Sequence, residues 1–401
     1  MNDPTFPGKL ALQQRVLPAY RGPFFDALAS ACEGGLSVFA GQPLPVENIA
    51  VRTSLEKAQY TAAVNRNFFP IRSPLYQCWQ GGLLEWLARW QPDALIIEAN
   101  PRVISNRQAI RWMHARGRVV LGWGLGIEPE RRGESGLFAA WRRRQRLGLV
   151  ESLDGVIAYS RRGAQQYRAA GFPPERVFVA PNAVTPRPEK APPSRPDMFQ
   201  GLPALLFVGR LQERKRIDNL LHACAYLPPG MQPDLWVVGD GPARKSFEDL
   251  AQAIYPSARF PGALRGPDLE PYFRRADLFV LPGTGGLAVQ QAMAHGLPVI
   301  VAQGDGTQED LVRLDEASEP LGEKNSWKVQ QGENGWLVQP NDRAALNQAL
   351  EEALSDAAQL RRMGEKSYQI VSQEINLEEM VRSFIQALRT LTSKNSRQVR
   401  T

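Results

Sequence analysis

Cysteine and histidine are scarce in this 401-residue chain, with only three of each. The cysteines, Cys32, Cys78 and Cys224, are odd in number and far apart in the sequence. They are typical of reduced thiols and not of a disulfide framework, which favours a cytoplasmic location. No two Cys or His residues stand at the short spacing that a zinc site needs. The sequence therefore argues against a structural metal.

Long apolar runs are absent as well. No stretch of about eighteen apolar residues occurs, and the opening MNDPTFPGKL lacks the basic-then-apolar order of a signal peptide. We therefore expect no segment that spans a membrane. The apolar share of 43% and the charged share of 22% are ordinary for a globular protein, and 401 residues suit two domains.

Positive charge is concentrated in the first half of the chain. Residues 1–190 contain 25 Lys and Arg against 15 Asp and Glu, a net charge of +10, and the remainder has 23 against 26, a net charge of −3. This imbalance indicates either an anionic partner, such as phospholipid headgroups, a lipid-linked diphosphate or nucleic acid, or a solvated arginine-rich surface. Nucleic acid fits least, because the basic half lacks interleaved aromatic platforms and a recognition motif.

Short apolar runs alternate with amphipathic stretches, a pattern typical of parallel strands joined by crossover helices. The predicted strands are Leu10–Val16, Leu36–Ala40, Ala94–Glu98, Val119–Gly122, Gly155–Ala158 and Val177–Ala180, then Leu205–Val208, Leu235–Val238, Leu278–Leu281, Val299–Val301 and Gly335–Val338. A proline-rich segment separates the two series. We therefore predict an α/β chain with one lobe at 1–184, a linker at 185–200, a second lobe at 201–374 and a C-terminal helix at 375–401 that packs back on the first lobe.

The segment LLFVGRLQERKRIDNLL has the residues that a diphosphate site needs. A predicted strand ends at Gly209, and Arg210 and Lys215 precede a helix that starts near Ile217. Glycine lets the backbone approach a ligand, a guanidinium grips two oxygens in a fork, and an ammonium adds a mobile charge. A solvated basic turn is the alternative interpretation.

The segment DLFVLPGTGGLAVQQAMAHG contains a second candidate loop. Its strand ends at Pro282, the loop from Gly283 to Gly286 is expected to expose backbone amides, and a helix begins at about Leu287. The helix end would direct about half a positive charge at a ligand, which suits an anion or a sugar hydroxyl. The glycine spacing is not that of a dinucleotide fingerprint.

In this order, the segments resemble the C-terminal lobe of the retaining family four glycosyltransferases. The resemblance rests on GRLQERK, VVGDGP, FPGALRG before ADLFVLPG, and AMAHGLPVI, and earlier on GVIAYSRRGAQQYRAAGF followed by VFVAPNAV. It implies a GT-B fold, in which two Rossmann-like lobes face each other across a cleft. It also implies a metal-independent, retaining transfer of a hexosyl group from a nucleotide diphosphate sugar, with no other cofactor. The acceptor would be a glycan, a lipid-linked or another hydroxyl compound in the synthesis of cell-surface polysaccharide or glycoconjugate, with no nucleic acid involved.

The resemblance also implies roles for individual residues. Arg210 and Lys215 would hold the donor diphosphate and stabilise its charge as the glycosidic bond breaks. The further donor-binding positions would be Gly209, Gly285, Gly286 and Leu287 at the sugar and phosphates, and Ala263 and Leu264 near the nucleobase. The family has two glutamates eight positions apart, where this chain has Gly283 and Gln291. The Gln291 amide can still bond a ribose hydroxyl, and Asp305 and Glu309 are candidate sugar contacts in place of the first glutamate.

In the first lobe, Arg21 and Gly22 stand where the family has a glycine-rich loop. Glu98 ends a predicted strand, and Asn100 lies in the loop that follows. These four residues are candidate sugar or acceptor contacts. The helical stretch that contains WRRRQR could lie on an anionic membrane at its inner, cytoplasmic face, or could be a solvated surface. Both family glutamates and the family's usual histidine are missing, so a catalytically inactive GT-B scaffold or nucleotide-sugar-binding protein is the alternative function. An epimerase of the same architecture would need an acid/base cluster that the sequence does not show.

Overall fold

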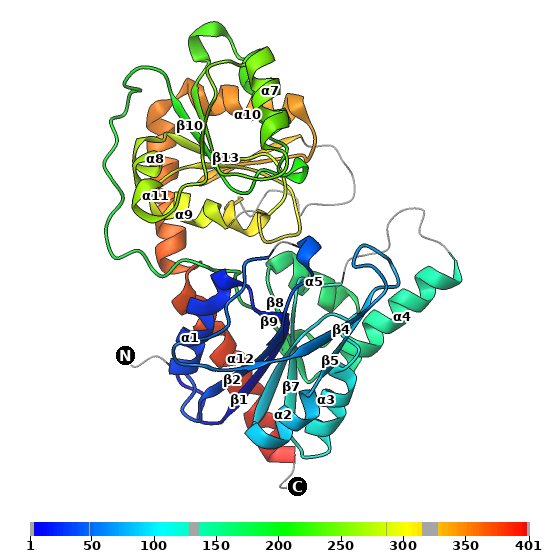
Figure 1. The fold of residues 1–401 in the computed structure, drawn as a ribbon. Helices are drawn as coiled ribbons and strands as arrows, with labels where there is room; N and C mark the ends of the chain where they lie inside the picture. The colour runs from blue at the N-terminus through cyan, green and yellow to red at the C-terminus, as the bar shows by residue number, and fades with distance from the viewer. Residues whose placement is uncertain (1–3, 48, 128–135, 286, 315–327, 399–401) are drawn as a thin grey trace. The chain divides into compact units, whose positions relative to one another are not determined.

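The computed structural model describes residues 4–47, 49–127, 136–285, 287–314 and 328–398. The chain divides into two compact units, an N-terminal unit of residues 1–184 together with 377–401, and a C-terminal unit of residues 185–376 (Figure 1). Each unit has a seven-stranded, largely parallel sheet with helices packed on it. The predicted α/β class with two Rossmann-like units is therefore confirmed. The predicted linker at 185–200 belongs to the C-terminal unit, and the segment from Leu377 onward belongs to the N-terminal unit.

The sheet of the N-terminal unit has the strand order β3-β2-β1-β6-β7-β8-β9, and every pair in it is parallel. Most of its strands are apolar runs buried on both faces, as helices on each side of a parallel sheet require. The strands are β1 (Leu10–Val16), β2 (Leu36–Gly41), β3 (Gln59–Ala62), β6 (Ala94–Glu98), β7 (Val119–Gly124), β8 (Gly155–Ala158) and β9 (Val177–Val179). The helices are α1 (Gly22–Ser30), α2 (Leu83–Trp90), α3 (Asn106–His114), α4 (Leu137–Glu151), α5 (Arg161–Ala169) and α12 (Leu377–Gln398).

A separate antiparallel hairpin of β4 (Val64–Phe68) and β5 (Gln77–Gly81) is fixed to the end of the main sheet. The Asn65 side-chain amide donates to the Arg15 carbonyl at 2.8 Å, and the Gln80 amide donates to the Gln14 carbonyl at 3.1 Å. Both carbonyls lie near the carboxyl end of β1. The base of the hairpin is therefore held at the carboxyl edge of the sheet.

The last helix, α12, completes the core of the N-terminal unit. Its buried residues Met380, Phe384, Ile385 and Leu388 belong to the same apolar cluster as Phe24 and Trp123. The Phe384 ring centroid lies 4.9 Å from that of Phe24 and 5.1 Å from that of Trp123. The apolar residues of α12 recur with the helical period and so form one stripe, which packs against α1 and the sheet.

The sheet of the C-terminal unit has the order β12-β11-β10-β13-β14-β16-β15, with only β15 antiparallel to its neighbour. Its strands are β10 (Ala204–Val208), β11 (Asp234–Val238), β12 (Arg259–Gly262), β13 (Leu278–Leu281), β14 (Val299–Ala302), β15 (Val329–Gly332) and β16 (Gly335–Val338). Its helices are α6 (Ile217–Tyr226), α7 (Arg244–Ile254), α8 (Glu270–Arg275), α9 (Ala288–Ala294), α10 (Arg343–Ser355) and α11 (Ala357–Gln373). None of the helices in the described ranges is both long and apolar enough to cross a bilayer.

Candidate active site

Three loops meet at the carboxyl edge of the C-terminal sheet. The strand order reverses at β10, which has β11 on one side and β13 on the other, and ligands of open parallel sheets bind at such a switch point. The loops after these strands are joined by backbone hydrogen bonds from Gly209 N to Val238 O at 3.0 Å and from Thr284 N to Arg214 O at 3.1 Å. The two segments singled out from the sequence, around Arg210 and around Gly283, are therefore brought together.

Glycine at two positions makes this close approach possible. At Gly239, where φ is +144°, a Cβ atom would lie 1.9 Å from the Gly209 carbonyl oxygen. At Gly283, a Cβ atom would lie 2.2 Å from the Arg214 oxygen and 2.6 Å from the Lys215 carbonyl carbon. All three distances are far below a van der Waals contact, and backbone atoms cannot move aside as a flexible side chain can. Gly283 therefore has no room for a side chain unless the neighbouring backbone moves.

Lys215 is the most buried cation of this edge, with 5% of its surface exposed. It ends the short 3-10 turn η4 (Glu213–Lys215), and its Nζ donates to the Thr284 carbonyl at 3.0 Å and to the Gly285 carbonyl. Burial, and then the nearby Arg214 guanidinium, lower the pKa of Lys215 to about 8. An ammonium has three donors. Lys215 therefore fixes the loop with two of them while its charge stays poorly compensated.

Two arginines flank this lysine. Arg214 donates from Nη1 to the Thr284 carbonyl at 3.1 Å and from Nε to the Gln212 side chain at 3.0 Å. Arg210 is half-buried and follows Gly209 directly at the end of β10. Arg214 and Lys215 therefore border the loop after β13, and Arg210 lies at the end of strand β10. Of these three cations, the sequence pointed to Arg210 and Lys215. The signal for Arg214 was its place in the same basic run, ERKR.

The loop after β14 supports the site through Gln308, which the sequence analysis missed. The Gln308 amide is 2% exposed, accepts a hydrogen bond from Gly285 N at 2.7 Å, and donates to Gly283 O at 3.0 Å and Ala302 O at 2.9 Å. Its neighbour Glu309, a candidate sugar contact, is buried and accepts from Gly304 N and Gly306 N. The Glu309 carboxylate thus shapes its own loop, while Asp305 is exposed and caps Thr307.

The expectation that the Gly283–Gly286 loop exposes its amides was wrong at two positions. Thr284 N bonds Arg214 O, and Gly285 N bonds the Gln308 side chain, because the loop is packed between the turn η4 and the loop after β14. Gly286 lies outside the described residues. Leu287 is half-buried and caps α9.

The remaining donor-side candidates lie farther along the same unit. Gln291 is exposed on α9 and lines a cavity of about 730 Å³ together with Gly266, His295 and linker residues. His295 bonds the Gln291 carbonyl at 2.7 Å and Glu270 at 2.8 Å, as expected for a residue at a helix end. Ala263, exposed, and Leu264, half-buried, follow the edge strand β12.

The N-terminal sheet has its own switch point between β1 and β6. There the Glu98 carboxylate accepts from Arg15 N at 3.0 Å and from the Asn100 amide at 3.1 Å. Both Glu98 and Asn100 are half-buried, so two sequence candidates stand together at a carboxyl edge. They form a polar pair that could meet a hydroxyl-rich ligand.

Arg21 and Gly22 do not stand in an open loop. Arg21 is 5% exposed, its guanidinium lies 4.9 Å from the Trp123 ring centroid and 5.5 Å from that of Tyr159, and it donates to the Asn182 side chain. Gly22 is the buried first residue of α1. The Arg21 side chain is thus used in packing, because cation–π contacts hold it inside the unit.

Comparisons with known proteins fit this geometry. Residues 195–370 match the profile of the family described as "Glycosyl transferases group 1". The lipopolysaccharide core biosynthesis glycosyltransferase of Rhizobium meliloti is 24% identical over 246 residues, which is 61% of this chain and 66% of that protein. The first curated relatives are matched over 24% to 66% of their own length.

Solved structures share the fold. The sucrose-phosphate synthase of Thermosynechococcus elongatus has a TM-score of 0.68 at 21% identity, over 96% of this chain and 99% of that one. Anabaena HepE in complex with UDP has a TM-score of 0.64 at 17% identity, over 97% and 99%. The matched profile contains the turn with Arg210 and Lys215, the Gly283 loop and Gln308. The C-terminal unit therefore carries a segment that matches the group 1 glycosyl transferases, and the two Rossmann-like units are those of the GT-B fold.

Proposed function

We propose that the chain is a retaining, metal-independent glycosyltransferase of the hexosyltransferase type, with a nucleotide diphosphate sugar as its donor substrate. One observation carries the proposal. Within the segment that matches the family profile, Arg214 and Lys215 bond the loop after β13, and Arg210 follows strand β10 at the switch point of the C-terminal sheet. A cationic edge of this kind fits a diphosphate, because charge-assisted bonds to phosphate oxygens are the strongest that these side chains make.

The donor would lie along this edge. Arg210 and Lys215 would hold the diphosphate, with the backbone of Gly209, Gly285 and Leu287 close to it, and Gly286 would belong to the same set. Gln291 would bond the ribose, and Ala263 and Leu264 would lie near the nucleobase. Since one structural relative is described as a complex with UDP, UDP and its sugars are the first donors to try.

Transfer would rely on electrostatics and not on a protein nucleophile. Arg210 and Lys215 would stabilise the charge that develops on the departing diphosphate, and the leaving phosphate would help to deprotonate the acceptor hydroxyl on the same face. Prepositioned cations in a partly dry site contribute much more than they would in water. No resident cofactor is needed in this scheme.

The acceptor would be a glycan, a lipid-linked compound or another hydroxyl compound, used in the synthesis of cell-surface polysaccharide or glycoconjugate. Glu98 and Asn100 are the acceptor-side candidates that remain in an accessible position. Nucleic acid is not expected as a partner. The three cysteines are free and buried, and we propose a cytoplasmic location with a peripheral place on the inner face of a membrane.

The test is donor binding followed by turnover. Calorimetry with UDP, GDP and their sugars on the parent chain identifies the base. Arg210→Ala and Lys215→Ala should then each weaken binding by about ten- to 150-fold, the value of one charge-assisted bond. Lys245→Ala, which removes an exposed lysine on α7 of the same unit, is the matched control and should bind normally. Normal binding in both site variants would refute the assignment of the diphosphate to these two cations, and no binding of any donor would favour the inactive scaffold.

A further inference from the structure

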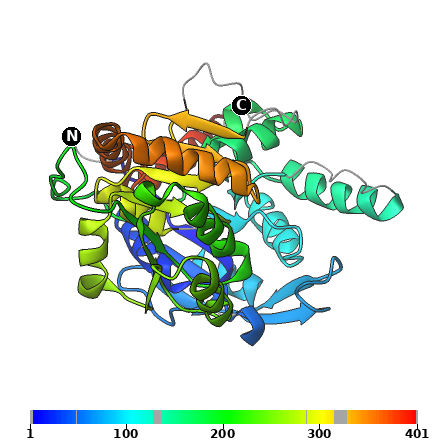
Figure 2. The same ribbon diagram turned by 90° about the horizontal axis from the view of Figure 1, so that it is seen from above.

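The β4–β5 hairpin and helix α4 project on the same side of the N-terminal unit (Figure 2). Both elements carry exposed apolar and basic side chains. The apolar members are Phe68, Phe69, Leu75 and Trp141, which are 46%, 59%, 42% and 41% exposed. Leu75 and Trp141 line one cavity of about 380 Å³, so the hairpin loop and α4 form a continuous surface, called here the hairpin–α4 surface.

Phe69 is held in a backbone conformation that packing does not explain. Its φ is +63°, in the left-handed region that costs a side-chain-bearing residue of this size free energy, yet its ring is more than half exposed. Its neighbour Phe68 ends β4 and is exposed as well. Two aromatic rings are therefore presented to the outside at the tip of a rigidly anchored hairpin.

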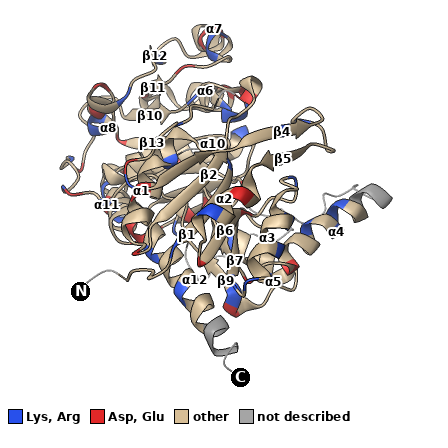
Figure 3. Ribbon diagram, turned by 60° about the horizontal axis from the view of Figure 1, so that its bottom comes forward, with Lys and Arg blue, Asp and Glu red and all other residues tan. Residues whose placement is uncertain are grey.

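The charge of this surface is predominantly positive. Residues 64–81, 106–114 and 137–151 together contain eight arginines, no lysine and a single carboxylate, Glu151. Figure 3 shows the cations spaced along α4. A solvated helix normally mixes both signs on its surface, so this bias is suited to a surface that is itself anionic.

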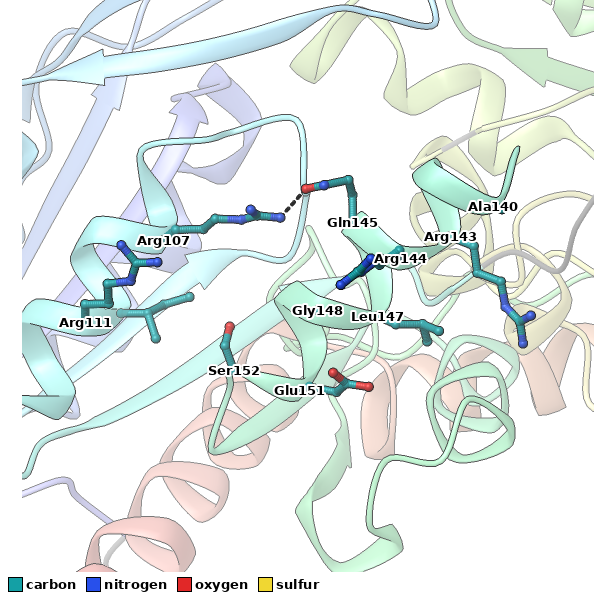
Figure 4. A pocket seen from close by; sticks show the side chains of 11 residues that line it. Arg107, Arg111, Ala140, Arg143, Arg144, Gln145, Leu147, Gly148, Glu151 and Ser152 are labelled. Carbon is teal, nitrogen blue, oxygen red and sulfur yellow. Dashed lines mark hydrogen bonds between the residues drawn. The ribbon is translucent and has the colours of Figure 1, made fainter. Parts of the chain in front are cut away.

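A groove of about 830 Å³ between α3 and α4 collects four of these arginines, Arg107, Arg111, Arg143 and Arg144 (Figure 4). Arg107 bonds the Gln145 side chain, which keeps the two helices in register. Within the described ranges, none of the four makes a salt bridge. The groove therefore has space and unpaired positive charge for a phosphate-sized anion.

We propose that the hairpin–α4 surface is a membrane-docking surface, in which Phe68 and Phe69 enter the headgroup region and the α3–α4 arginines bind anionic headgroups. Phenylalanine rings on a basic, amphipathic surface can be buried at the boundary between headgroups and acyl chains, and each arginine near an anionic surface strengthens binding about five-fold. The hairpin is bonded to the carboxyl edge of the sheet, where Glu98 and Asn100 lie. Docking would thus bring the acceptor-side edge close to lipid headgroups.

The docking surface deepens the proposed acceptor chemistry. It rests on the proposed function in one respect, because a lipid-linked hydroxyl compound is taken as the acceptor. The docking itself is independent of catalysis and can be measured without a donor.

The test is sedimentation of the full chain with phosphatidylcholine vesicles, with and without phosphatidylglycerol, at low and high salt. The parent should bind the anionic vesicles at low salt and lose most of that binding at high salt, because the screening length falls to about 3 Å at 1 M. Arg143→Gln with Arg144→Gln should weaken binding about thirty-fold and reduce its salt dependence. Phe68→Ser with Phe69→Ser should weaken it about ten-fold and leave the salt dependence unchanged.

The matched controls lie in the C-terminal unit. Tyr226→Ser removes a 74% exposed apolar ring, Lys245→Gln removes an exposed cation, and both should bind vesicles like the parent. Four results would overturn the inference. Three concern the parent, namely failure to bind anionic vesicles, equal binding to phosphatidylcholine alone, and binding of a short RNA in place of vesicles. The fourth is unchanged vesicle binding by both double variants. Calorimetry with UDP on the same samples separates the two claims, since loss of donor binding with docking intact refutes only the proposed function.

Discussion

Gly283→Ala is a small change with a large expected effect, because the added methyl group meets backbone on two sides. The new Cβ would lie 2.2 Å from the Arg214 oxygen and 2.7 Å from the Lys215 Cα. To relieve these contacts, the loop after β13 and the turn η4 must move apart by about 1 Å or more, because non-bonded heavy atoms normally stay about 3.5 Å or more apart. The hydrogen bonds from Thr284 N to Arg214 O and from Lys215 Nζ to Thr284 O stretch as they do so.

Overpacking of this kind costs about 1–3 kcal/mol, and stretching two hydrogen bonds adds about 1–2 kcal/mol more. Urea unfolding, or thermal unfolding at roughly 2–4 °C for each kcal/mol, measures the loss of stability in the C-terminal unit. Calorimetry on the same variant measures donor affinity, which should fall because Lys215 moves. Gly230→Ala is the matched control, since its Cβ would meet nothing within 4 Å, and its stability should stay the same or rise slightly.

Gly283→Glu separates this reasoning from the view that a useful carboxylate has simply been lost here. On packing grounds the glutamate should destabilise the unit more than alanine does and should bring no gain in turnover. If Gly283→Ala unfolds at the same urea concentration as the parent, or if Gly283→Glu binds donor more tightly, the tight packing described for this loop is refuted.

Other perturbations of the C-terminal unit have equally definite outcomes. Donor affinity, measured by calorimetry, should fall as pH rises above about 8. The reason is that the protonated form of Lys215 binds the diphosphate, and the pKa of Lys215 in the free protein is about 8. An affinity that does not change with pH, or the same pH dependence in Lys215→Ala, would count against this. Gln308→Leu leaves Gly285 N and two carbonyls unpaired, so it should lower the free energy of unfolding in urea by about 3 kcal/mol or more. Gln331→Leu, at an exposed position, should be nearly neutral. Equal unfolding midpoints of the two variants would refute the supporting role of Gln308. Gln291→Ala should weaken donor binding by about 1–3 kcal/mol while Gln291→Glu binds at least as tightly, and equal affinities in all three chains would favour the scaffold. Excess EDTA should leave turnover unchanged, and a full loss that Mg²⁺ or Mn²⁺ restores would contradict metal independence.

The buried strands could be predicted from the sequence because they are continuous apolar runs. β1, β6, β8, β13 and β16 have the predicted bounds, and the other predicted strands differ by one or two residues at an end. The strands that were missed are β3, β4, β5, β12 and β15. They are sheet edges or the hairpin, with mostly exposed or half-buried residues, so their stability comes from pairing and not from an apolar run that the sequence could show.

The candidate site was predictable where charge and glycine signal a ligand, and not where a role depends on packing. Arg210 and Lys215 stand at the expected edge, because motif order and strand ends are local features. Gln308 was missed because a buried amide that braces a neighbouring loop has no local signature. Arg21 has the right residue type in the right segment, but Trp123 and Tyr159, distant in sequence, enclose it.

The arrangement around Lys215 bears on whether the site is still in use. Lys215 is 5% exposed, and burial and a neighbouring arginine lower its pKa, so its charge destabilises the fold. Within the described ranges, no carboxylate pairs with it. Two loop carbonyls compensate only part of its lost hydration. An apolar residue of similar volume would stabilise an abandoned scaffold better, since removal of a poorly paired buried charge often gains stability. A bound diphosphate would supply the missing negative charge, and this is why we propose that the site still binds an anion.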